Sequence, residues 1–383
     1  MDEPADLPIV EFHPQKLSFI YEMISGHETT HTPPPSLHCT KILIPVIHPL
    51  IDAIMSERID LKAIKGQLRK RKMGRVQVAK LPDGSAVDVP IALFCGQKEK
   101  PRLWLQAGIH GDELDAIGAA IKVLNSLDEG NLLGTVAVLP VVNTLAFRSR
   151  SRVAPIDYKD MNRLWDTRVE NVGYTSAYSE IVVQGILEEL HGFEPDYVID
   201  LHGGGASALV PYVEYACGGG GADRKAEEMA KATRMRVIWR NKEIRFKGAL
   251  SYLMASEGVP AVVIEGGGRA GIDDRESTTV AEAILNCMSY LSMIPSREGK
   301  EPIDQIFVEK GNWVRAKSPG LWHQLCEPGS IVTKGQVLAR ISDVFGKTLE
   351  TTMAPVDGIL IGIRKSGIVQ VGDYGVNVGE IAR

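Results

Sequence analysis

The sequence predicts an α/β fold, in which a mostly parallel or mixed sheet is flanked by helices and followed by a small all-β domain. Between residues 73 and 298, short apolar runs typical of buried strands alternate with helical stretches, which indicates a sheet covered on both faces. After residue 298, short strands and turns dominate and helical periodicity is almost absent. We therefore predict an N-terminal extension of unknown function at 1–72, a main domain at 73–298 and a β-rich C-terminal domain at 299–383.

Composition narrows the class of protein. With 383 residues, of which 44% are hydrophobic, the chain can bury a substantial core and belongs among globular proteins. A net charge of −5 argues against a nucleic-acid partner, because phosphate contacts need a basic surface, and favours a small-molecule substrate. The five cysteines never occur in CxxC spacing, and the acidic start lacks the features of a signal peptide. We therefore expect a cytoplasmic protein without a cysteine zinc site or a membrane span.

The individual elements of the N-terminal extension and the main domain follow from periodicity and turn residues. Residues 49–72 predict an amphipathic helix whose end carries a cluster of lysine and arginine. Alternating valines on both sides of Pro82-Asp83-Gly84 predict a β-hairpin over residues 74–96. Further strands are predicted at 102–106, 135–142, 196–201, 236–239 and 260–264, and further helices at 179–191, at 222–234 and from Leu114 onward.

The predicted strand at 102–106 ends near two residues that suit a metal ion. Gly108 interrupts the apolar run, and His110 and Glu113 follow just before the helix that begins at Leu114. An imidazole and a carboxylate three residues apart at such a turn can bind one cation from the same side. In isolation, this spacing is more typical of a loop histidine and a first-turn glutamate that the helix dipole favours.

A second predicted strand ends in the sequence DLHGGG. His202 closes the apolar run, and the glycines after it allow backbone or ligand to approach closely. Asp200, two residues earlier, is a candidate hydrogen-bond partner for a metal-bound imidazole. Alone, His202 is more simply a hydrogen-bonded loop histidine. Because the carboxyl ends of parallel strands meet at one edge of a sheet, His110, Glu113 and His202 together predict the two-histidine, one-glutamate set of a catalytic zinc.

A third predicted strand ends in VIEGGG, and Glu265 is its last charged residue. A carboxylate at that edge can lie close to the metal without binding it, where it would accept a proton from the bound water. The alternative is a salt-bridge partner that caps the sheet.

The segment after the strand at 135–142 is rich in arginine. Arg148, Arg150 and Arg152 alternate, so they would share one face of an extended chain, and Asn162-Arg163 follows them. Guanidinium groups there suit an oxyanion or a substrate carboxylate, since they pair bidentately and stay charged. A basic surface patch is the alternative interpretation.

The four segments together resemble a known family. GIHGDE, the arginine-rich stretch that ends in MNRLW, DLHGGG and VIEGGG occur in an order similar to that of the succinylglutamate desuccinylase/aspartoacylase family, a branch of the zinc carboxypeptidase clan. The resemblance covers about residues 75–383 and is strongest to deacylases of N-acyl amino acids, such as acetyl-diaminobutyrate deacetylases. Leu164-Trp165 and Asp115-Ala116 depart from the family pattern, which indicates altered pocket walls.

The resemblance implies a zinc carboxypeptidase-like fold, with one Zn²⁺ per chain in a catalytic domain at 73–298 and an unmodified half-barrel at the C-terminus. The implied roles are zinc ligation by His110, Glu113 and His202, general base catalysis by Glu265, oxyanion stabilisation by Arg152, and substrate binding by Asn162, Arg163 and, as our addition, Arg150.

The implied function is that of a zinc-dependent hydrolase acting on C–N bonds other than peptide bonds. It would cleave the amide bond of an N-acyl amino acid with a zinc-activated water, and it would need neither nucleic acid nor membrane as a partner. Assembly into a homo-oligomer is left open. One alternative is a zinc carboxypeptidase acting on small peptides. Another is a non-catalytic protein that binds a ligand through its metal, although such a site has no use for a base at Glu265.

The C-terminal domain has a second interpretation. The spacing around Lys347 is similar to that of biotinyl and lipoyl carrier domains, which place a modified lysine on a hairpin tip. The residues before Lys347 are Asp343-Val344-Phe345-Gly346, which do not match the usual neighbours of that lysine. The unmodified half-barrel therefore fits better.

Overall fold

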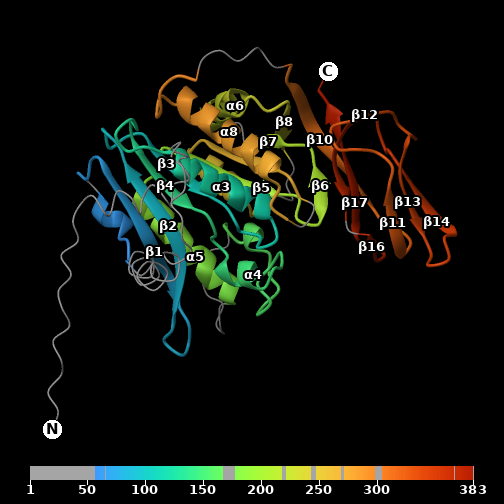
Figure 1. Cartoon of the computed structure of the whole chain (residues 1–383), viewed down its shortest axis with the longest axis horizontal. Helices are drawn as coiled ribbons and strands as arrows, with labels where there is room; N and C mark the ends of the chain where they lie inside the picture. The colour runs from blue at the N-terminus through green and yellow to red at the C-terminus, as the bar shows by residue number, and fades with distance from the viewer. Residues whose placement is uncertain are drawn as a thin grey trace, which may run out of the picture. The chain divides into compact units, whose positions relative to one another are not determined.

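The computed structural model of the chain describes residues 57–382, except 65, 167–176, 218–220, 243–246, 269–270, 298–303 and 366. It shows a 13-stranded mixed sheet with helices packed against it and a separate four-stranded antiparallel sheet near the C-terminus (Figure 1). The predicted α/β fold class is therefore confirmed. Among the described residues, no helix combines the length and the apolar composition needed to cross a membrane.

The strands and helices predicted in the main domain are present, with small shifts at their ends, together with several that were not predicted. The strands are β1 (Lys70–Lys80), β2 (Ala86–Cys95), β3 (Arg102–Gln106), β4 (Thr135–Leu139), β5 (Tyr197–Gly203), β6 (Ser207–Leu209), β7 (Tyr212–Ala216), β8 (Val237–Asn241) and β9 (Ala261–Gly266). The helices are η1 (Leu61–Ile64), α3 (Leu114–Ser126), α4 (Thr144–Arg148), η2 (Met161–Arg163), α5 (Tyr178–Phe193), α6 (Gly221–Ala232), α7 (Leu250–Ser256) and α8 (Asp274–Tyr290).

The predicted helix at 49–72 is wrong in its described part, and its first eight positions, 49–56, lie outside the described residues. One short 3-10 turn, η1, is followed by Gly66 at φ +77°, and strand β1 already begins at Lys70. A glycine in the left-handed conformation ends a helix. Residues Lys70 to Lys72 then pair with β2, so this part of the chain is a strand and not a helix. The hairpin of β1 and β2 around residues 81–85 is confirmed.

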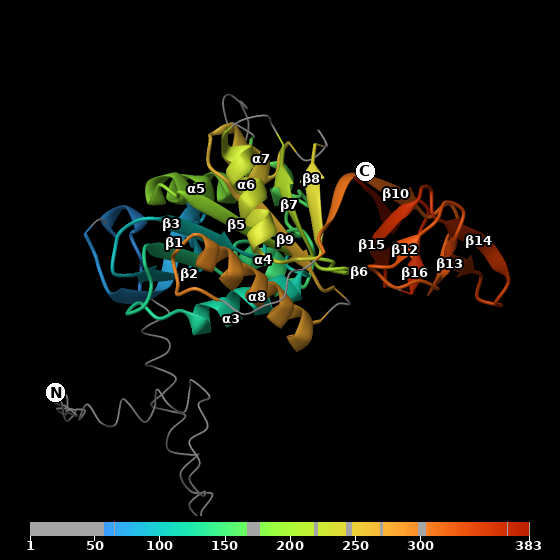
Figure 2. The same ribbon diagram turned by 90° about the horizontal axis from the view of Figure 1, so that it is seen from above.

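Two layers of helices cover the two faces of the large sheet (Figure 2). Helices α3, α6 and α8 share one apolar core with Leu103 and Leu105 of β3. Helices α5 and α7 share the other core with Trp104, which points to the opposite face because side chains alternate along a strand. The continuous apolar run of β3 is thus explained by burial on both sides.

The centre of the sheet is parallel. Strand β3 pairs in parallel with β4 and β5, and β5 pairs in parallel with β9. Strand β7 runs antiparallel to β9 and parallel to β8. The carboxyl ends of β3, β5 and β9 consequently lie at one edge of the sheet, where the candidate site is found.

The C-terminal strands are β10 (Ile306–Arg315), β11 (Gly320–Gln324), β12 (Ile331–Val332), β13 (Val337–Ser342), β14 (Thr348–Met353), β15 (Gly358–Arg364), β16 (Ile368–Val369) and β17 (Tyr374–Ile381). Strand β10 extends the large sheet by pairing with β8, and β15 pairs with β6. The four strands β14, β13, β11 and β16 form the second sheet. The boundary at residue 299 stays a prediction, as does the carrier alternative for the exposed Lys347.

Candidate functional site

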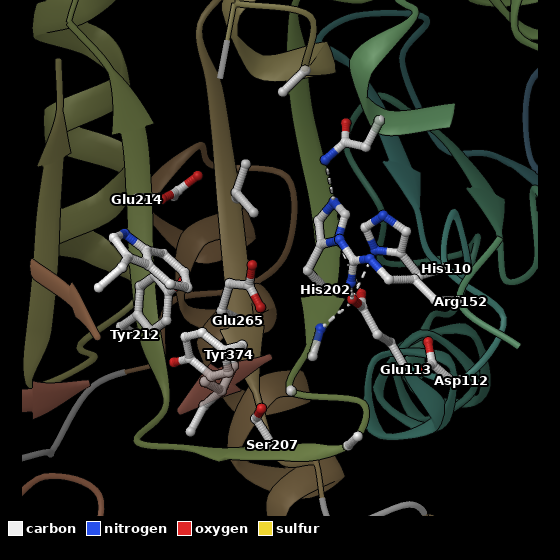
Figure 3. Close-up of a pocket in the computed structure, with 18 of the residues that line it drawn as sticks. His110, Asp112, Glu113, Arg152, His202, Ser207, Tyr212, Glu214, Glu265 and Tyr374 are labelled. Atoms are coloured by element: carbon white, nitrogen blue, oxygen red, sulfur yellow. Dashed lines mark hydrogen bonds and ion pairs between the residues drawn. The ribbon is translucent and has the colours of Figure 1, made fainter. Parts of the chain in front are cut away.

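Three parallel strands bring the candidate residues to one edge of the sheet. His110 lies in the turn after β3, Glu113 is the N-cap residue of α3, and His202 lies near the end of β5. In the register of β5 and β9, His202 is the direct neighbour of Glu265. The close-up shows these side chains facing a common space (Figure 3).

His110, Glu113 and His202 converge on a point that a metal ion can occupy. One ligand atom from each lies within 4.8 Å of the others, and all three residues are buried. Nδ1 of His110 is 2.7 Å from one carboxylate oxygen of Glu113, and Nδ1 of His202 is 2.9 Å from the other. The Glu113 side chain makes no capping bond to its helix, so it is available to the site.

Each imidazole is held from behind by an aspartate. Nε2 of His202 lies 3.2 Å from Oδ2 of Asp200, and Nε2 of His110 lies 3.0 Å from Oδ1 of Asp160. An N–H donated to a carboxylate at Nε2 leaves the lone pair on Nδ1, which is the nitrogen that faces Glu113. This arrangement is typical of histidines that bind zinc.

The hydrogen bond of Asp200 agrees with the sequence prediction, whereas Asp160 was missed. Asp160 lies two residues before Asn162 in a segment without strand or helix periodicity. Its position beside the candidate residues Asn162 and Arg163 was the one feature of the sequence that could have indicated a role at the site. Only folding brings it against a histidine 50 positions earlier.

The charge balance at the three residues also fits a cation. Burial raises the pKa of Glu113, but His110 and His202 outweigh it and hold that pKa well below its ordinary value. Burial lowers the pKa of His202, but the carboxylates of Asp200 and Glu113 raise it well above its ordinary value. The carboxylates of Glu113 and Asp200 thus favour positive charge at this site, which a divalent ion would also supply.

Glu265 lies beside His110, Glu113 and His202. The structure records no hydrogen bond between its side chain and theirs. Burial, opposed by the charge of His202 and reinforced by the nearby carboxylates of Glu113 and Glu214, raises the pKa of its carboxyl to about 8. A carboxyl group with such a pKa can change its protonation state at neutral pH, as a general base requires.

Arg152 reaches the same space from the segment after β4. One guanidinium nitrogen donates to Oε1 of Glu113 at 2.9 Å, and the other lies 3.4 Å from Oδ2 of Asp160. Burial lowers the pKa of Arg152, but Glu113 and Asp160 raise it above its ordinary value, so the group stays charged.

The expectation that three arginines share one extended face is wrong. Asn143 caps helix α4 by accepting from the backbone N–H of Ala146, and Arg148 is the last residue of that helix. Arg150 then adopts a left-handed conformation at φ +52° and is exposed. Neither Arg148 nor Arg150 lines the cavity at the site. The helix cap decides the local structure because it satisfies backbone donors that an extended chain would leave open.

Asn162 and Arg163 both line the cavity, and η2 positions them. Nδ2 of Asn162 lies 3.2 Å from Nε2 of His202, and Arg163 donates to the backbone oxygen of Asn162 at 2.8 Å. The backbone N–H of Trp165 donates to the carbonyl of Gly248. This bond links the turn that carries Asn162 and Arg163 to the segment before α7.

The family of this chain is identified by its similarity to known proteins. The model of the succinylglutamate desuccinylase/aspartoacylase catalytic domain matches residues 99–291, about half of the chain. The chain belongs to the succinylglutamate desuccinylase/aspartoacylase family. The resemblance predicted from the four sequence motifs is thus confirmed.

Individual relatives of this succinylglutamate desuccinylase/aspartoacylase family member agree with the assignment. The chain is 25% identical over 308 residues to an N-alpha-acetyl-L-2,4-diaminobutyric acid deacetylase of Halomonas elongata, with 77% of this chain and 86% of the relative covered. Its fold resembles the product-bound ectoine utilization protein EutE of Ruegeria pomeroyi at a TM-score of 0.71 and 20% identity, covering 81% of this chain and 94% of that one. It also resembles an aspartoacylase family protein of Mesorhizobium loti at a TM-score of 0.70 and 22% identity, covering 86% and 100%.

In this family member, the C-terminal strands complete the cavity. The cavity holds about 410 Å³ and is lined by His110, Glu113 and His202 together with Trp313 and Arg315 of β10, Arg364 of β15 and Tyr374 of β17. None of these four residues was predicted, because nothing in a β-rich sequence says which strand faces a distant site. Tyr212 and Glu214, which also line the cavity, were missed because the strand that carries them, β7, was not predicted.

The glycines of the family motifs bring the edge loops together. A Cβ on Gly204 would lie 2.1 Å from the carbonyl oxygen of Ser207, and one on Gly268 would lie 1.7 Å from the same atom. The buried carboxylate of Asp115, at a position where the sequence departs from the family pattern, accepts the backbone N–H of Gly268 at 2.7 Å. Asp115 thereby ties α3 to the loop after Glu265.

Proposed function

We propose that this protein is a zinc-dependent amidohydrolase that cleaves the amide bond of small N-acyl amino acids. The observation that carries the proposal is the convergence of His110, Glu113 and His202 beside Glu265 in one cavity. When bound there, zinc would supply Lewis acidity and lower the pKa of water toward neutrality, so that hydroxide is available as the nucleophile at neutral pH. The relative from Halomonas elongata, a deacetylase by name, supports the reaction class.

Glu265 acts as the general base. It takes the proton of the attacking water and later donates that proton to the leaving amine, so that the products are a carboxylic acid and an amino acid. With a pKa of about 8, the protonated carboxyl is a good proton donor to the leaving amine. A divalent cation held beside it would lower this pKa, so that the carboxylate can accept the proton of the attacking water.

Arg152 stabilises the oxyanion that forms on the carbonyl oxygen. Its guanidinium is held at the site by Glu113 and Asp160 before substrate arrives, so no reorganisation is needed. Donors of this kind are typically worth about 3–4 kcal/mol of the activation free energy.

Asn162 and Arg163 bind the carboxylate of the substrate. Both line the cavity, and a guanidinium with an amide can hold a carboxylate through two hydrogen bonds. Arg150 takes no part, because its side chain does not line the cavity.

The size of the site favours small substrates over peptides. Trp313, Arg315 and Tyr374 wall the cavity from the C-terminal strands, so the volume of about 410 Å³ suits an acylated amino acid better than a peptide chain. A carboxypeptidase would need an open groove for the remainder of its substrate.

The test is hydrolysis by the zinc-loaded full-length protein. N-acetyl, N-formyl and N-succinyl amino acids are incubated with it, and release of the free amine is followed. We expect turnover of at least one acyl series, and loss of turnover for the matching α-methyl esters, because an ester cannot pair with Arg163. Cleavage of C-terminal residues from tripeptides at a comparable rate, with N-acyl amino acids left intact, would establish the carboxypeptidase instead.

A further inference from the structure

The carboxylate of Asp115 connects the helix that carries Glu113 to the segment that follows Glu265. Asp115 is 1% exposed and is not among the residues that line the cavity. It lies in the first turn of α3, two residues after Glu113, the N-cap residue of that helix and a candidate zinc ligand. One helical turn therefore carries both side chains.

Both oxygens of this carboxylate accept backbone hydrogen bonds from the segment between β9 and α8. Oδ2 accepts the N–H of Gly268 at 2.7 Å, and Oδ1 accepts the N–H of Asp273 at 2.6 Å. Gly268 lies three residues after Glu265, and Asp273 is the N-cap residue of α8. Asp115 thus holds this segment where it leaves the strand and again where it enters the helix.

The glycines after Glu265 allow the backbone to lie directly against the carboxylate. Gly267 and Gly268 adopt positive φ values of +70° and +115°. A Cβ on Gly267 would lie 2.0 Å from Oδ2 of Asp115. Residues with a side chain would therefore be strained here and would push the carboxylate away.

The carboxyl group of Glu265 depends on its backbone for its position. Among the described residues, the structure records no hydrogen bond to this group. The backbone of Glu265 pairs with His202 on one side and with Tyr212 on the other, and the pairing with β5 ends at Gly266. Beyond that point, one isolated bridge joins Gly268 to Ala208, and Asp115 is the side chain that completes the support.

We propose that Asp115 is a positioning residue that sets the distance between the candidate zinc ligand Glu113 and the general base Glu265. Because Asp115 and Glu113 share one turn of α3, movement of the segment after β9 relative to Asp115 moves Glu265 relative to Glu113 (Figure 3). The inference rests on the proposed function, in which Glu265 takes a proton from water and gives it to the leaving amine. Such transfer needs heavy atoms within about 2.6–3.2 Å of each other, so a small displacement of Glu265 slows it.

The experiment replaces Asp115 by Asn in the full-length zinc-loaded protein. Asn is nearly isosteric, but its NH2 group cannot accept a backbone N–H, so one of the two hydrogen bonds is lost. For an N-acyl amino acid that the unaltered protein hydrolyses, we expect kcat to fall by roughly 10- to 100-fold, while KM changes by less than about twofold. The zinc content should stay unchanged.

Asp274→Asn is the matched control. Asp274 also joins α3 to the start of α8, but through an exposed ion pair with Lys122. Exposed ion pairs of this kind contribute little to the fold. The kcat of Asp274→Asn should therefore equal that of the unaltered protein, and an equal fall in both variants would overturn the inference.

A double-mutant cycle separates the positioning of Glu265 from a general loosening of the fold. In Glu265→Gln the positioned group no longer transfers a proton, so adding Asp115→Asn should change kcat by less than about twofold. The same fall in both backgrounds would overturn the inference, as would an unchanged kcat in Asp115→Asn alone. If circular dichroism shows that Asp115→Asn does not fold, the cycle is run with Asp115→Ala, which leaves room for a water molecule at the two N–H groups.

Amide hydrogen exchange separates this inference from the proposed function. Exchange at Gly268 and Asp273 is followed by mass spectrometry of a peptide that spans both, and it should be at least about tenfold faster in Asp115→Asn than in Asp274→Asn. Faster exchange in a protein that hydrolyses no N-acyl compound would support the hold of Asp115 on this segment and overturn the deacylase. Hydrolysis with equal exchange and equal kcat in the two variants would support the deacylase and overturn the role of Asp115.

Discussion

Oδ1 of Asp160 lies 3.0 Å from Nε2 of His110, although the two residues are 50 positions apart. The same aspartate pairs with Arg152 and caps η2 by accepting the backbone N–H of Asn162. One carboxylate thus orients a candidate zinc ligand, the candidate oxyanion donor and the candidate carboxylate clamp.

We expect Asp160→Asn to weaken zinc binding by about 10- to 100-fold, because the imidazole loses the partner that fixes its tautomer and orientation. Zinc affinity is measured by competition with a chromophoric chelator. Asp166→Asn, an exposed change three residues after Arg163, serves as the control. Equal zinc affinities of the two variants would contradict the role of Asp160.

His202→Ala should lose its zinc on dialysis while the fold is retained, since the residue lies at the edge of the sheet and not within either apolar core. His110→Ala and Glu113→Ala should behave in the same way. Zinc content is determined by elemental analysis, and folding by circular dichroism. One zinc per chain in His202→Ala would mean that the ion binds elsewhere.

Glu265→Gln should keep its zinc and lower kcat by a factor of about 10² to 10⁴, because an amide of nearly the same shape cannot take up a proton. Zinc analysis and steady-state kinetics on the same preparation test both parts. Loss of zinc would make Glu265 a metal ligand, and a nearly unchanged kcat would leave the base unidentified.

Gly248→Ala should raise KM for N-acyl amino acids and lower the melting temperature. A Cβ at this position would lie 2.3 Å from the carbonyl oxygen of Arg163, so the turn that carries Asn162 and Arg163 must move. Such overpacking typically costs roughly 1–3 kcal/mol. Gly221→Ala meets nothing within 4 Å and is the matched control. Identical KM values for the two variants would show that the turn has no part in binding.

Acid should destabilise the protein partly through Glu227. Hydrogen bonds from Lys231 and Tyr215, together with the charge of Arg240, lower the pKa of Glu227 to about 2 in the folded state. A carboxyl with a lowered pKa stabilises the fold above its unfolded pKa of roughly 4.3, and this contribution is lost as the pH falls toward 2. Urea unfolding at pH 7 and pH 3 should therefore show a smaller loss of stability in Glu227→Gln than in the unaltered protein. An equal or larger loss in the variant would contradict this assignment.

The periodicity of apolar residues was sufficient to predict most strands and helices of the central fold. The apolar run of β3 and the helical spacing from Leu114 predicted both elements, because burial on two faces or on one stripe leaves a direct mark on the residue order. The helix predicted at 49–72 failed where a glycine and sheet pairing outweighed an amphipathic pattern. The extended arginine segment failed because Asn143 caps a helix there.

The sequence by itself determined the family and the candidate zinc ligands, since His110, Glu113 and His202 stand at the ends of recognisable strands and parallel strands deliver such residues to one edge. Tertiary structure alone decided which groups surround them. Asp160, Glu214 and Tyr374 come from segments whose local sequence specifies no direction, and their place at the cavity depends on how β7, β17 and the turn before η2 pack against the site. Contacts between residues far apart in the chain arise from packing, and packing leaves no periodic mark in the order of residues.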